Sequence, residues 1–241
     1  MTIYFFIILS LSVFYIIIQT IYTEGWKALS IWNIPNDFQP KTKISILIPA
    51  RNEADNIGNC IESILNQTYP KNLFEIIVLD DFSEDETAEL VNNYTKNNLT
   101  TIRLIALGNY ISLDDTQSFK KKAIEIGIAQ ANGELIVTTD ADCVVQPNWL
   151  MLIASIYEEK QPKFIAAPVN FYQEQNDFER FQSLDFIGMM GITGSGIHTK
   201  LMNMCNGANL AYSKAVFYEV KGFFPSIFKI KRPGPNYVAQ Y

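Results

Sequence analysis

The sequence predicts an α/β fold, in which helices cover both faces of a mostly parallel sheet, with one membrane-spanning helix before it. Two observations predict this fold: short apolar segments alternate with amphipathic ones from residue 44 onward, and residues 1–23 are apolar and carry no charge. The chain has 241 residues, of which 48% are hydrophobic, so it is long enough for one substantial core. Alternation of strands and helices is typical of parallel sheets that are buried on both sides.

The N-terminal segment, residues 1–23, reads MTIYFFIILSLSVFYIIIQTIYT. At a rise of 1.5 Å per residue, a helix of this length crosses a hydrocarbon layer of about 30 Å. It lacks the basic start and small-residue cleavage site of a signal peptide. Lys27, Lys41 and Lys43 follow the segment and no basic residue precedes it, so the positive-inside rule predicts a single-pass anchor with the remaining chain in the cytoplasm. Residues 24–43 are expected to form a linker.

Periodicity predicts the elements of the following domain. A capping box of Ser83 and Glu86 is expected to start one of its helices. The expected elements, in chain order, are a strand at 44–50, a helix at 53–67, a strand at 74–81, a helix after Glu86, a strand at 102–107, a lysine-rich helix from about Lys120 and a strand at 134–140.

Polar residues follow three of the predicted strands. These segments are PARNE at 49–53, DDFSED at 80–85 and DAD at 140–142. In open parallel sheets the ligand binds beyond the carboxyl ends of the strands. Carboxylates crowded at one edge repel each other unless a cation or hydrogen-bond donors compensate, which predicts a divalent metal and a polar ligand. The net charge of −6 and the scattered basic residues argue against a nucleic-acid partner.

Four segments together resemble a known family. SILIPARNEADNIGNCIESILNQTYP, FEIIVLDDFSEDET, GELIVTTDADC and CNGANLAYSKAVFYEVKGF resemble, in order and spacing, the family 2 glycosyltransferases, whose fold is the Rossmann-like GT-A fold. The resemblance covers residues 44–223, the predicted catalytic domain. A nucleotidyltransferase would share the alternating fold but would need a glycine-rich loop after the first strand, and PARNEADN contains none.

The resemblance implies that the domain binds a nucleotide-diphosphate sugar. Carboxylates suit this donor because they accept hydrogen bonds from ribose hydroxyls and base N–H groups. The implied donor-binding residues are Pro49, Arg51, Glu53, Asp80, Asp81, Lys120 and Asp140.

The DAD segment resembles the Asp-x-Asp motif of these enzymes, which binds Mg²⁺ or Mn²⁺ at the donor diphosphate. Hard oxygen ligands suit both metals. On an extended chain, residues two apart project to one face, so Asp140 and Asp142 are expected to reach one ion. The resemblance implies that Asp142 is the more direct metal ligand.

The NGANLAYSK segment resembles the acceptor side of the family's sugar pocket. The resemblance implies that Asn206, Gly207 and Asn209 shape its floor, where small residues allow close approach of the backbone. A short helix is expected at 214–220, closed by Gly222.

Relatives invert the anomeric carbon with an Asp or Glu general base, which lies shortly beyond a GF step that matches Gly222 and Phe223. The tail at 224–241 resembles nothing in the family, and no Asp follows Asp185. Glu219 is the remaining candidate base. The expectation is therefore a membrane-anchored, C-terminally truncated inverting glycosyltransferase that acts on a glycan, a lipid or another acceptor. The alternative is a catalytically deficient pseudoenzyme that binds nucleotide.

Overall fold

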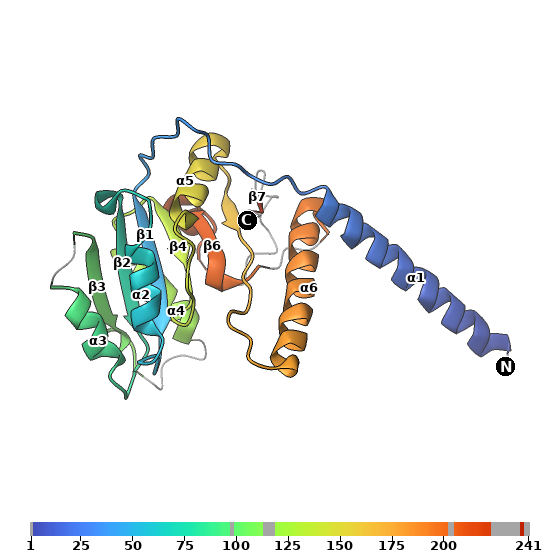
Figure 1. Ribbon diagram of the computed structural model, residues 1–241, viewed down its shortest axis with the longest axis horizontal. Helices are drawn as coiled ribbons and strands as arrows, with labels where there is room; N and C mark the ends of the chain where they lie inside the picture. Colours follow the sequence, from blue (N-terminus) through green and yellow to red (C-terminus); the bar gives the residue numbers. More distant parts are fainter. Residues whose placement is uncertain (1, 97–98, 113–118, 202–204, 223–236, 239–241) are drawn as a thin grey trace. The chain divides into compact units, whose positions relative to one another are not determined.

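The computed structural model describes residues 2–96, 99–112, 119–201, 205–222 and 237–238 (Figure 1). The chain divides into two compact units. The first contains residues 1–32, 166–206 and 236–241, and the second contains residues 33–165 and 207–235. The division cuts across the predicted domain at 44–223, because residues 166–206 group with the N-terminal helix.

The second unit is built on a mixed, mostly parallel sheet, as predicted. Its six strands lie in the order β3-β2-β1-β4-β6-β5. Strand β1 runs parallel to β2 and β4, β2 runs parallel to β3, and β4 pairs antiparallel with β6. The strands are β1 (Ile44–Ala50), β2 (Phe74–Asp80), β3 (Thr101–Ala106), β4 (Leu135–Thr138), β5 (Phe164–Ala166) and β6 (Leu210–Ser213).

Helices alternate with these strands (Figure 1). The α-helices of this unit are α2 (Ile57–Leu65), α3 (Thr87–Tyr94), α4 (Phe119–Gln130), α5 (Trp149–Lys160) and α7 (Lys214–Glu219). Three short 3₁₀ helices are η1 (Lys71–Leu73), η2 (Leu107–Asn109) and η3 (Gly207–Asn209). The first unit contains α1 (Thr2–Lys27), α6 (Asp177–Thr199) and the two-residue strand β7 (Tyr237–Val238).

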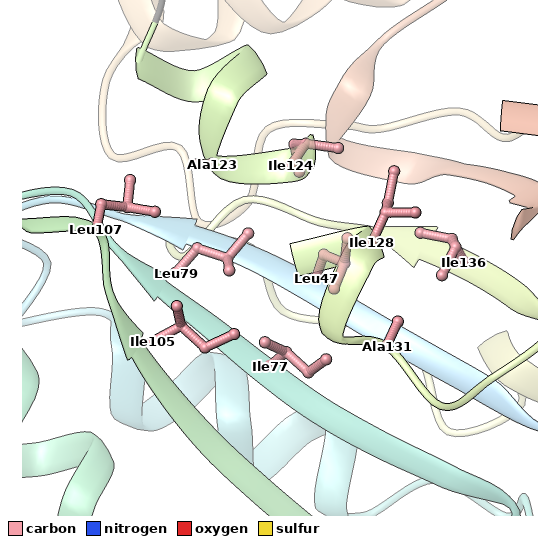
Figure 2. Packing of buried hydrophobic residues seen from close by; sticks show 10 residues of the cluster. All are labelled: Leu47, Ile77, Leu79, Ile105, Leu107, Ala123, Ile124, Ile128, Ala131 and Ile136. Carbon is pink, nitrogen blue, oxygen red and sulfur yellow. The ribbon is translucent and has the colours of Figure 1, made fainter. Parts of the chain in front are cut away.

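The core lies where α4 packs on the sheet (Figure 2). Every residue of β2 is buried, which explains why its middle residues, 76–79, are all apolar rather than alternating with polar ones. A Cβ atom on Gly127 of α4 would lie 3.0 Å from Leu79 Cδ1 and 3.2 Å from Leu47 Cδ1, so glycine lets α4 approach β1 and β2 closely. The cluster contains Leu47, Ile77, Leu79, Ile105, Leu107, Ala123, Ile124, Ile128, Ala131 and Ile136.

Two local predictions were wrong. The helix expected at 53–67 begins only at Ile57, because Glu53 belongs to a turn in which its carbonyl accepts from the N–H of Asn56 at 3.0 Å. The capping box of Ser83 and Glu86 does not form, since Glu86 caps α3 without a side-chain hydrogen bond. The Ser83 hydroxyl instead accepts from the backbone of Asn52 at 3.0 Å, which joins the loops after β1 and β2.

A buried carboxylate ties the amino ends of the strands together. Glu75, the second residue of β2, is 6% exposed, and its two oxygens accept four hydrogen bonds. The donors are Ser45 Oγ at 2.6 Å, the backbone N–H and side-chain Nδ2 of Asn132 at 2.6 and 3.0 Å, and Arg103 Nη2 at 2.9 Å. Burial raises the pKa of Glu75, but these hydrogen bonds and the charge of Arg103 outweigh burial and lower the pKa overall.

Helix α1 in the first unit has the length and composition to cross a membrane, and it is the one such helix among the described residues. None of its most apolar 18-residue window is buried. Its C-terminal end packs against α6: a Cβ atom on Gly25 would overlap Ser195 Oγ and lie 2.8 Å from Thr199 Cγ2. Gly25 therefore allows the two helix backbones to approach each other closely.

Candidate functional site

The carboxyl ends of β1, β2 and β4 lie at one edge of the sheet. Parallel pairing places Ala50 beside Asp80 at the ends of β1 and β2. Thr138, the last residue of β4, pairs with Leu47, so Asp140 follows two residues later in the direction of the same edge. The three polar segments singled out in the sequence are thus carried to one side of the unit.

The loops after β1 and β2 are joined by reciprocal hydrogen bonds. The Asn52 N–H donates to Ser83 Oγ at 3.0 Å, and the Glu84 N–H donates to Asn52 Oδ1 at 2.8 Å. The Glu53 N–H donates to Thr87 Oγ1 at 2.8 Å. Asn52 has a φ of 55°, a left-handed conformation that Asn adopts more readily than most residues. Asn52 was not predicted as a site residue, although an Asn two residues beyond a strand end was a usable signal.

Asp85 has a structural role at the start of α3. Its carboxylate accepts from the Thr87 N–H at 3.0 Å, from the Thr87 hydroxyl at 2.5 Å and from the Ala54 N–H at 3.1 Å. The hydrogen bond from the Thr87 side chain is the main cause that lowers the pKa of Asp85. These three bonds account for the carboxylate without a ligand.

Three predicted donor-binding residues lie along the end of β1. Pro49 is half-buried within the strand, Arg51 is exposed directly after it, and Glu53 is half-buried in the next turn. Glu53 Oε2 accepts from Asn56 Nδ2 at 2.9 Å. Arg51 is close enough to Asp81 for its charge to lower the pKa of that carboxyl group. This segment therefore supplies a cation beside the acids at the end of β2.

Asp81 is the unusual acid of this edge. Its Oδ1 atom is buried and accepts no hydrogen bond, and it is the one carboxylate oxygen in that condition among the described residues. Burial raises the pKa of Asp81, the adjacent Asp80 carboxylate raises it further, and Arg51 partly offsets both. Asp80 as a whole residue is 8% exposed, and its Oδ1 accepts weakly from the Ser83 N–H at 3.4 Å. A buried acceptor without a donor is costly, so its presence points to a donor brought by a ligand.

The DAD segment forms a turn rather than the extended strand end that was expected. The Cys143 N–H donates to the Asp140 carbonyl at 3.2 Å, and β4 has already ended at Thr138. Asp140 and Asp142 therefore do not share one face of an extended strand. Asp142 is exposed, and Asp140 Oδ1 accepts from Lys120 Nζ at 2.7 Å. The structure thus brings Lys120 to the DAD turn.

The residues at this turn fit a divalent metal only in part. Asp140 and Asp142 provide hard oxygen ligands, which Mg²⁺ and Mn²⁺ prefer. No group of three or more His, Cys, Asp or Glu residues suitable for a metal occurs in the described part of the chain. A metal held by Asp140 or Asp142 would therefore need further ligands from outside the described residues. Such a site suits an ion that arrives with a phosphate group.

The predicted acceptor-side residues lie in η3 or directly before it. Asn209 is buried, and its Oδ1 accepts from Trp149 Nε1 at 2.9 Å, so this side chain anchors η3 to α5. The Gly207 carbonyl accepts from the Thr138 hydroxyl at 2.5 Å. A Cβ atom on Gly207 would meet no atom of the described residues within 4 Å, so their packing does not require glycine there. Asn206 is half-buried directly before η3.

Glu219 lies away from this edge. Strand β6 runs antiparallel to β4 and pairs Ser213 with Leu135, so α7 follows at the amino end of β4. The Lys214 N–H donates to the Glu134 carbonyl at 2.8 Å, which fixes the start of α7 at that end. The Glu219 carboxylate pairs with Lys163 at 3.0 Å on the surface. The structure therefore does not bring Glu219 to the DAD turn. The segment at 223–236, which corresponds to the place of the base in relatives, lies outside the described residues.

Comparison with known proteins gives a consistent family. Residues 45–221 match the family described as Glycosyl transferase family 2. The chain is similar to the glycosyltransferase AglE of Haloferax volcanii, with 33% identity over 108 residues that make up 44% of this chain and 33% of that protein. It is also similar to the poly-beta-1,6-N-acetyl-D-glucosamine synthase of Staphylococcus epidermidis, with 24% identity over 78% of this chain and 43% of that protein. The chain thus spans less than half the length of these two curated relatives.

Solved structures share the fold. The mannosyltransferase PcManGT of Pyrobaculum calidifontis, in complex with GDP-Man and Mn²⁺, aligns with a TM-score of 0.63 and 17% identity over 92% of this chain and 64% of that one. TarS 1-349 of S. aureus aligns with a TM-score of 0.56 and 18% identity over 81% of this chain and 57% of that one. Identities this low show the fold alone, and the fold confirms the GT-A architecture expected from the sequence.

Proposed function

The chain belongs to glycosyltransferase family 2, and we propose that it binds a nucleotide-diphosphate sugar at the carboxyl edge of its sheet and transfers the sugar with inversion to a glycan or lipid-linked acceptor. The observation that carries the proposal is the buried, unpartnered Oδ1 of Asp81 beside the polar ends of β1, β2 and β4. A solved relative of the same fold contains a nucleotide sugar and Mn²⁺, which supports a donor of this class.

The loops after β1 and β2 hold the nucleoside in this proposal. Asp81 Oδ1 accepts a hydrogen bond from a base N–H or a ribose hydroxyl, which removes the cost of leaving it unpaired. The same edge also carries Pro49, Arg51, Glu53 and Asp80. The reciprocal hydrogen bonds between the two loops hold these groups in place before the donor arrives, so little ordering remains to be done on binding.

The DAD turn and Lys120 hold the diphosphate. Asp142 and Asp140 would bind Mg²⁺ or Mn²⁺, with Asp142 as the more accessible ligand because Lys120 already contacts Asp140. The metal, when bound, neutralises charge on the departing diphosphate as a Lewis acid. Lys120 pairs with Asp140 in the free protein and can turn its ammonium group to a phosphate oxygen in the complex, since the side chain is 60% exposed.

The acceptor side is assigned to the segment at Asn206, Gly207 and Asn209. Asn209 supports this segment through its hydrogen bond with Trp149, while the open space around Gly207 leaves room for a sugar. The acceptor hydroxyl needs a general base for direct in-line attack. None of the described residues beyond η3 places a carboxylate at this edge, since the carboxylate of Glu219 pairs with Lys163 near the amino end of β4.

Helix α1 anchors the protein in a membrane in this proposal, with the rest of the chain in the cytoplasm. None of its apolar window is buried, which is costly in water and favourable in lipid. Lys27, Lys41 and Lys43 follow the helix and favour the cytoplasmic side. Nucleotide sugars in that compartment would reach the sheet edge directly.

Calorimetry with UDP and GDP tests the proposed donor site. We expect one of the two nucleotides to bind in the presence of Mn²⁺ and to weaken sharply when a chelator removes the metal. Asp142→Asn should lose the metal-dependent part of the affinity, whereas Glu219→Gln, which removes a carboxylate at the other end of the sheet, should bind as the unmodified chain does. Binding that ignores both the chelator and Asp142→Asn would refute the metal-assisted site. Binding without sugar transfer would favour the nucleotide-binding pseudoenzyme instead.

A further inference from the structure

Helix α6 carries large exposed apolar side chains on more than one side; Phe178 and Met189, 68% and 43% exposed, lie apart from the three residues described next. Phe181 and Leu184 are 66% and 67% exposed, and Ile187 is 47% exposed. The three residues recur at three-residue intervals and therefore lie along one side of the helix. We call Phe181, Leu184 and Ile187 the apolar stripe. Exposed side chains of this size in contiguous positions mark an interaction surface more often than scattered single ones do.

The apolar stripe leads directly to the contact between α6 and α1. Steps of three or four residues along α6 from Ile187 stay on the same side of the helix and lead to Gly191, Gly194 and Ser195. A Cβ atom on Gly194 would lie 3.1 Å from both Leu29 Cδ1 and Trp26 Cζ3, and Ser195 faces Gly25 of α1. The side of α6 that packs on the end of the apolar helix is thus the side that carries the stripe.

Another side of α6 is covered by the protein itself. Ser183 is buried and its hydroxyl is hydrogen-bonded to Glu174, in the segment just before the helix. The ring of Phe171 in the same segment packs on Phe186, with 5.0 Å between ring centroids. The preceding segment therefore covers the side of Ser183 and Phe186 and leaves the stripe open.

We propose that the apolar stripe of α6 inserts into the surface of the bilayer that α1 spans, at the boundary between headgroups and acyl chains. This inference rests on the proposed membrane anchoring of α1. Because α6 packs on the cytoplasmic end of α1, its stripe is held at the level where the apolar helix leaves the lipid. Burial of aromatic and aliphatic side chains at this boundary is favourable even when the helix does not cross the membrane.

The charges of α6 define the kind of lipid contact. The helix carries three carboxylates, Asp177, Glu179 and Asp185, and one guanidinium, Arg180, which pairs with Asp177 at 3.2 Å. Helices that bind anionic headgroups are rich in Lys and Arg on their polar face, and α6 is not. The attraction is therefore apolar, and it does not depend on anionic lipid.

Spin labels on the full chain reconstituted in phosphatidylcholine vesicles test the inference. Cys143 and Cys205 are first replaced by Ser, which leaves Cys60 buried and unreactive. Single labels are placed at Leu184→Cys on the stripe, at Gln182→Cys on another exposed side of the same turn, and at Val13→Cys in α1. Collision rates with oxygen, which concentrates in lipid, and with a water-soluble nickel chelate are measured at each site. Phe181→Cys serves as a second stripe position in case Leu184→Cys does not fold.

The oxygen-to-nickel collision ratio at Leu184 should be several-fold higher than at Gln182 and should approach the ratio at Val13. It should not change when phosphatidylglycerol replaces part of the phosphatidylcholine. A water-like ratio at Leu184 with a lipid-like ratio at Val13 would overturn the stripe and leave the anchor intact. Low collision rates with both reagents at Leu184 would show that protein, such as a second copy of the chain, covers the stripe, and would also overturn the inference. A water-like ratio at Val13 would refute the anchor itself.

Discussion

Two acids at opposite ends of β2 differ in how the protein satisfies them. Glu75, near the amino end, is buried and accepts four hydrogen bonds from side chains and backbone, and its pKa is lowered. Asp81, directly after the carboxyl end, has a buried oxygen with no donor, and its pKa is raised. Both side chains are polar groups at the margins of the same sheet. The comparison indicates that Glu75 stabilises the fold, whereas Asp81 is held ready for a ligand.

Glu75→Gln should have the largest effect on folding. The substitution leaves Arg103 without its carboxylate partner. It also replaces one carboxylate oxygen, which accepts hydrogen bonds, by an amide NH₂ group that faces the same donors. Breaking a buried ion pair costs about 3 kcal/mol or more of folding free energy. Denaturant unfolding of the chain in detergent, followed by the fluorescence of the buried Trp149, measures this loss. A loss below about 1 kcal/mol, the net value of one ordinary hydrogen bond, would show that the network is not structural.

Asp81→Asn should have the opposite profile. The free energy of unfolding should equal that of the unmodified chain or be slightly higher, because the substitution removes a carboxylate whose burial the folded protein does not compensate. Nucleotide affinity should fall by roughly tenfold or more, since a hydrogen bond to a charged group contributes about 1.5–3 kcal/mol. Unfolding and calorimetry on the same preparation separate the two effects. Loss of stability together with unchanged nucleotide affinity would place Asp81 with Glu75 as a structural acid.

The two acids should also respond oppositely to pH. The folded pKa of Glu75 is lowered, so its stabilising contribution is present above its unfolded pKa and is lost as the pH falls through the folded value. The folded pKa of Asp81 is raised. Its contribution to stability is therefore fully present below its unfolded pKa, where the side chain is protonated, and is lost as the pH rises through the folded value and the buried carboxylate becomes charged. The stability deficit of Glu75→Gln should therefore shrink on acidification. Any stability gain of Asp81→Asn should also vanish on acidification, because Asp81 itself is then neutral. A gain that grows on acidification would contradict the raised pKa of Asp81.

Lys120→Met should have the smallest effect. The Lys120 and Asp140 side chains are 60% and 34% exposed, and such a surface ion pair contributes about 0–1 kcal/mol. Removal of the ammonium group should raise the affinity of the free protein for Mn²⁺ a few-fold and lower the affinity for nucleotide diphosphate. Electron paramagnetic resonance of Mn²⁺ measures the first change and calorimetry the second. If both affinities fell together, Lys120 would be supporting the metal site rather than competing with the ion.

Much of the second unit could be predicted from the sequence. The buried strands at 44–50 and 74–80 are mostly apolar and are followed by polar residues, so their approximate bounds and their shared edge followed from composition. The helix α6 was missed, because apolar residues outside the apolar stripe, such as Phe178 and Met189, obscure its period. The turn at Asp140 was also missed, since local hydrogen bonding to Cys143 ends β4 two residues before the motif.

The role of individual site residues was harder to predict than their location. Composition placed Asp81 and Asp85 in one acidic segment, but hydrogen bonds formed across two loops satisfy Asp85 and leave Asp81 unpaired. Glu219 became a candidate base only because few acids lie nearby in the sequence. The antiparallel pairing of β6 with β4, which a sequence pattern does not specify, carries it to the other end of the sheet.

The account assigns the nucleoside to the Asp81 end of β2 and the diphosphate, through a divalent metal, to the DAD turn. Calorimetry with a nucleoside monophosphate and the matching diphosphate, each with and without Mn²⁺, tests this division most directly. We predict that Mn²⁺ raises the affinity for the diphosphate and leaves the affinity for the monophosphate nearly unchanged, while Asp81→Asn weakens both nucleotides to the same degree. Equal strengthening of both nucleotides by the metal, or an effect of Asp81→Asn confined to the diphosphate, would contradict it.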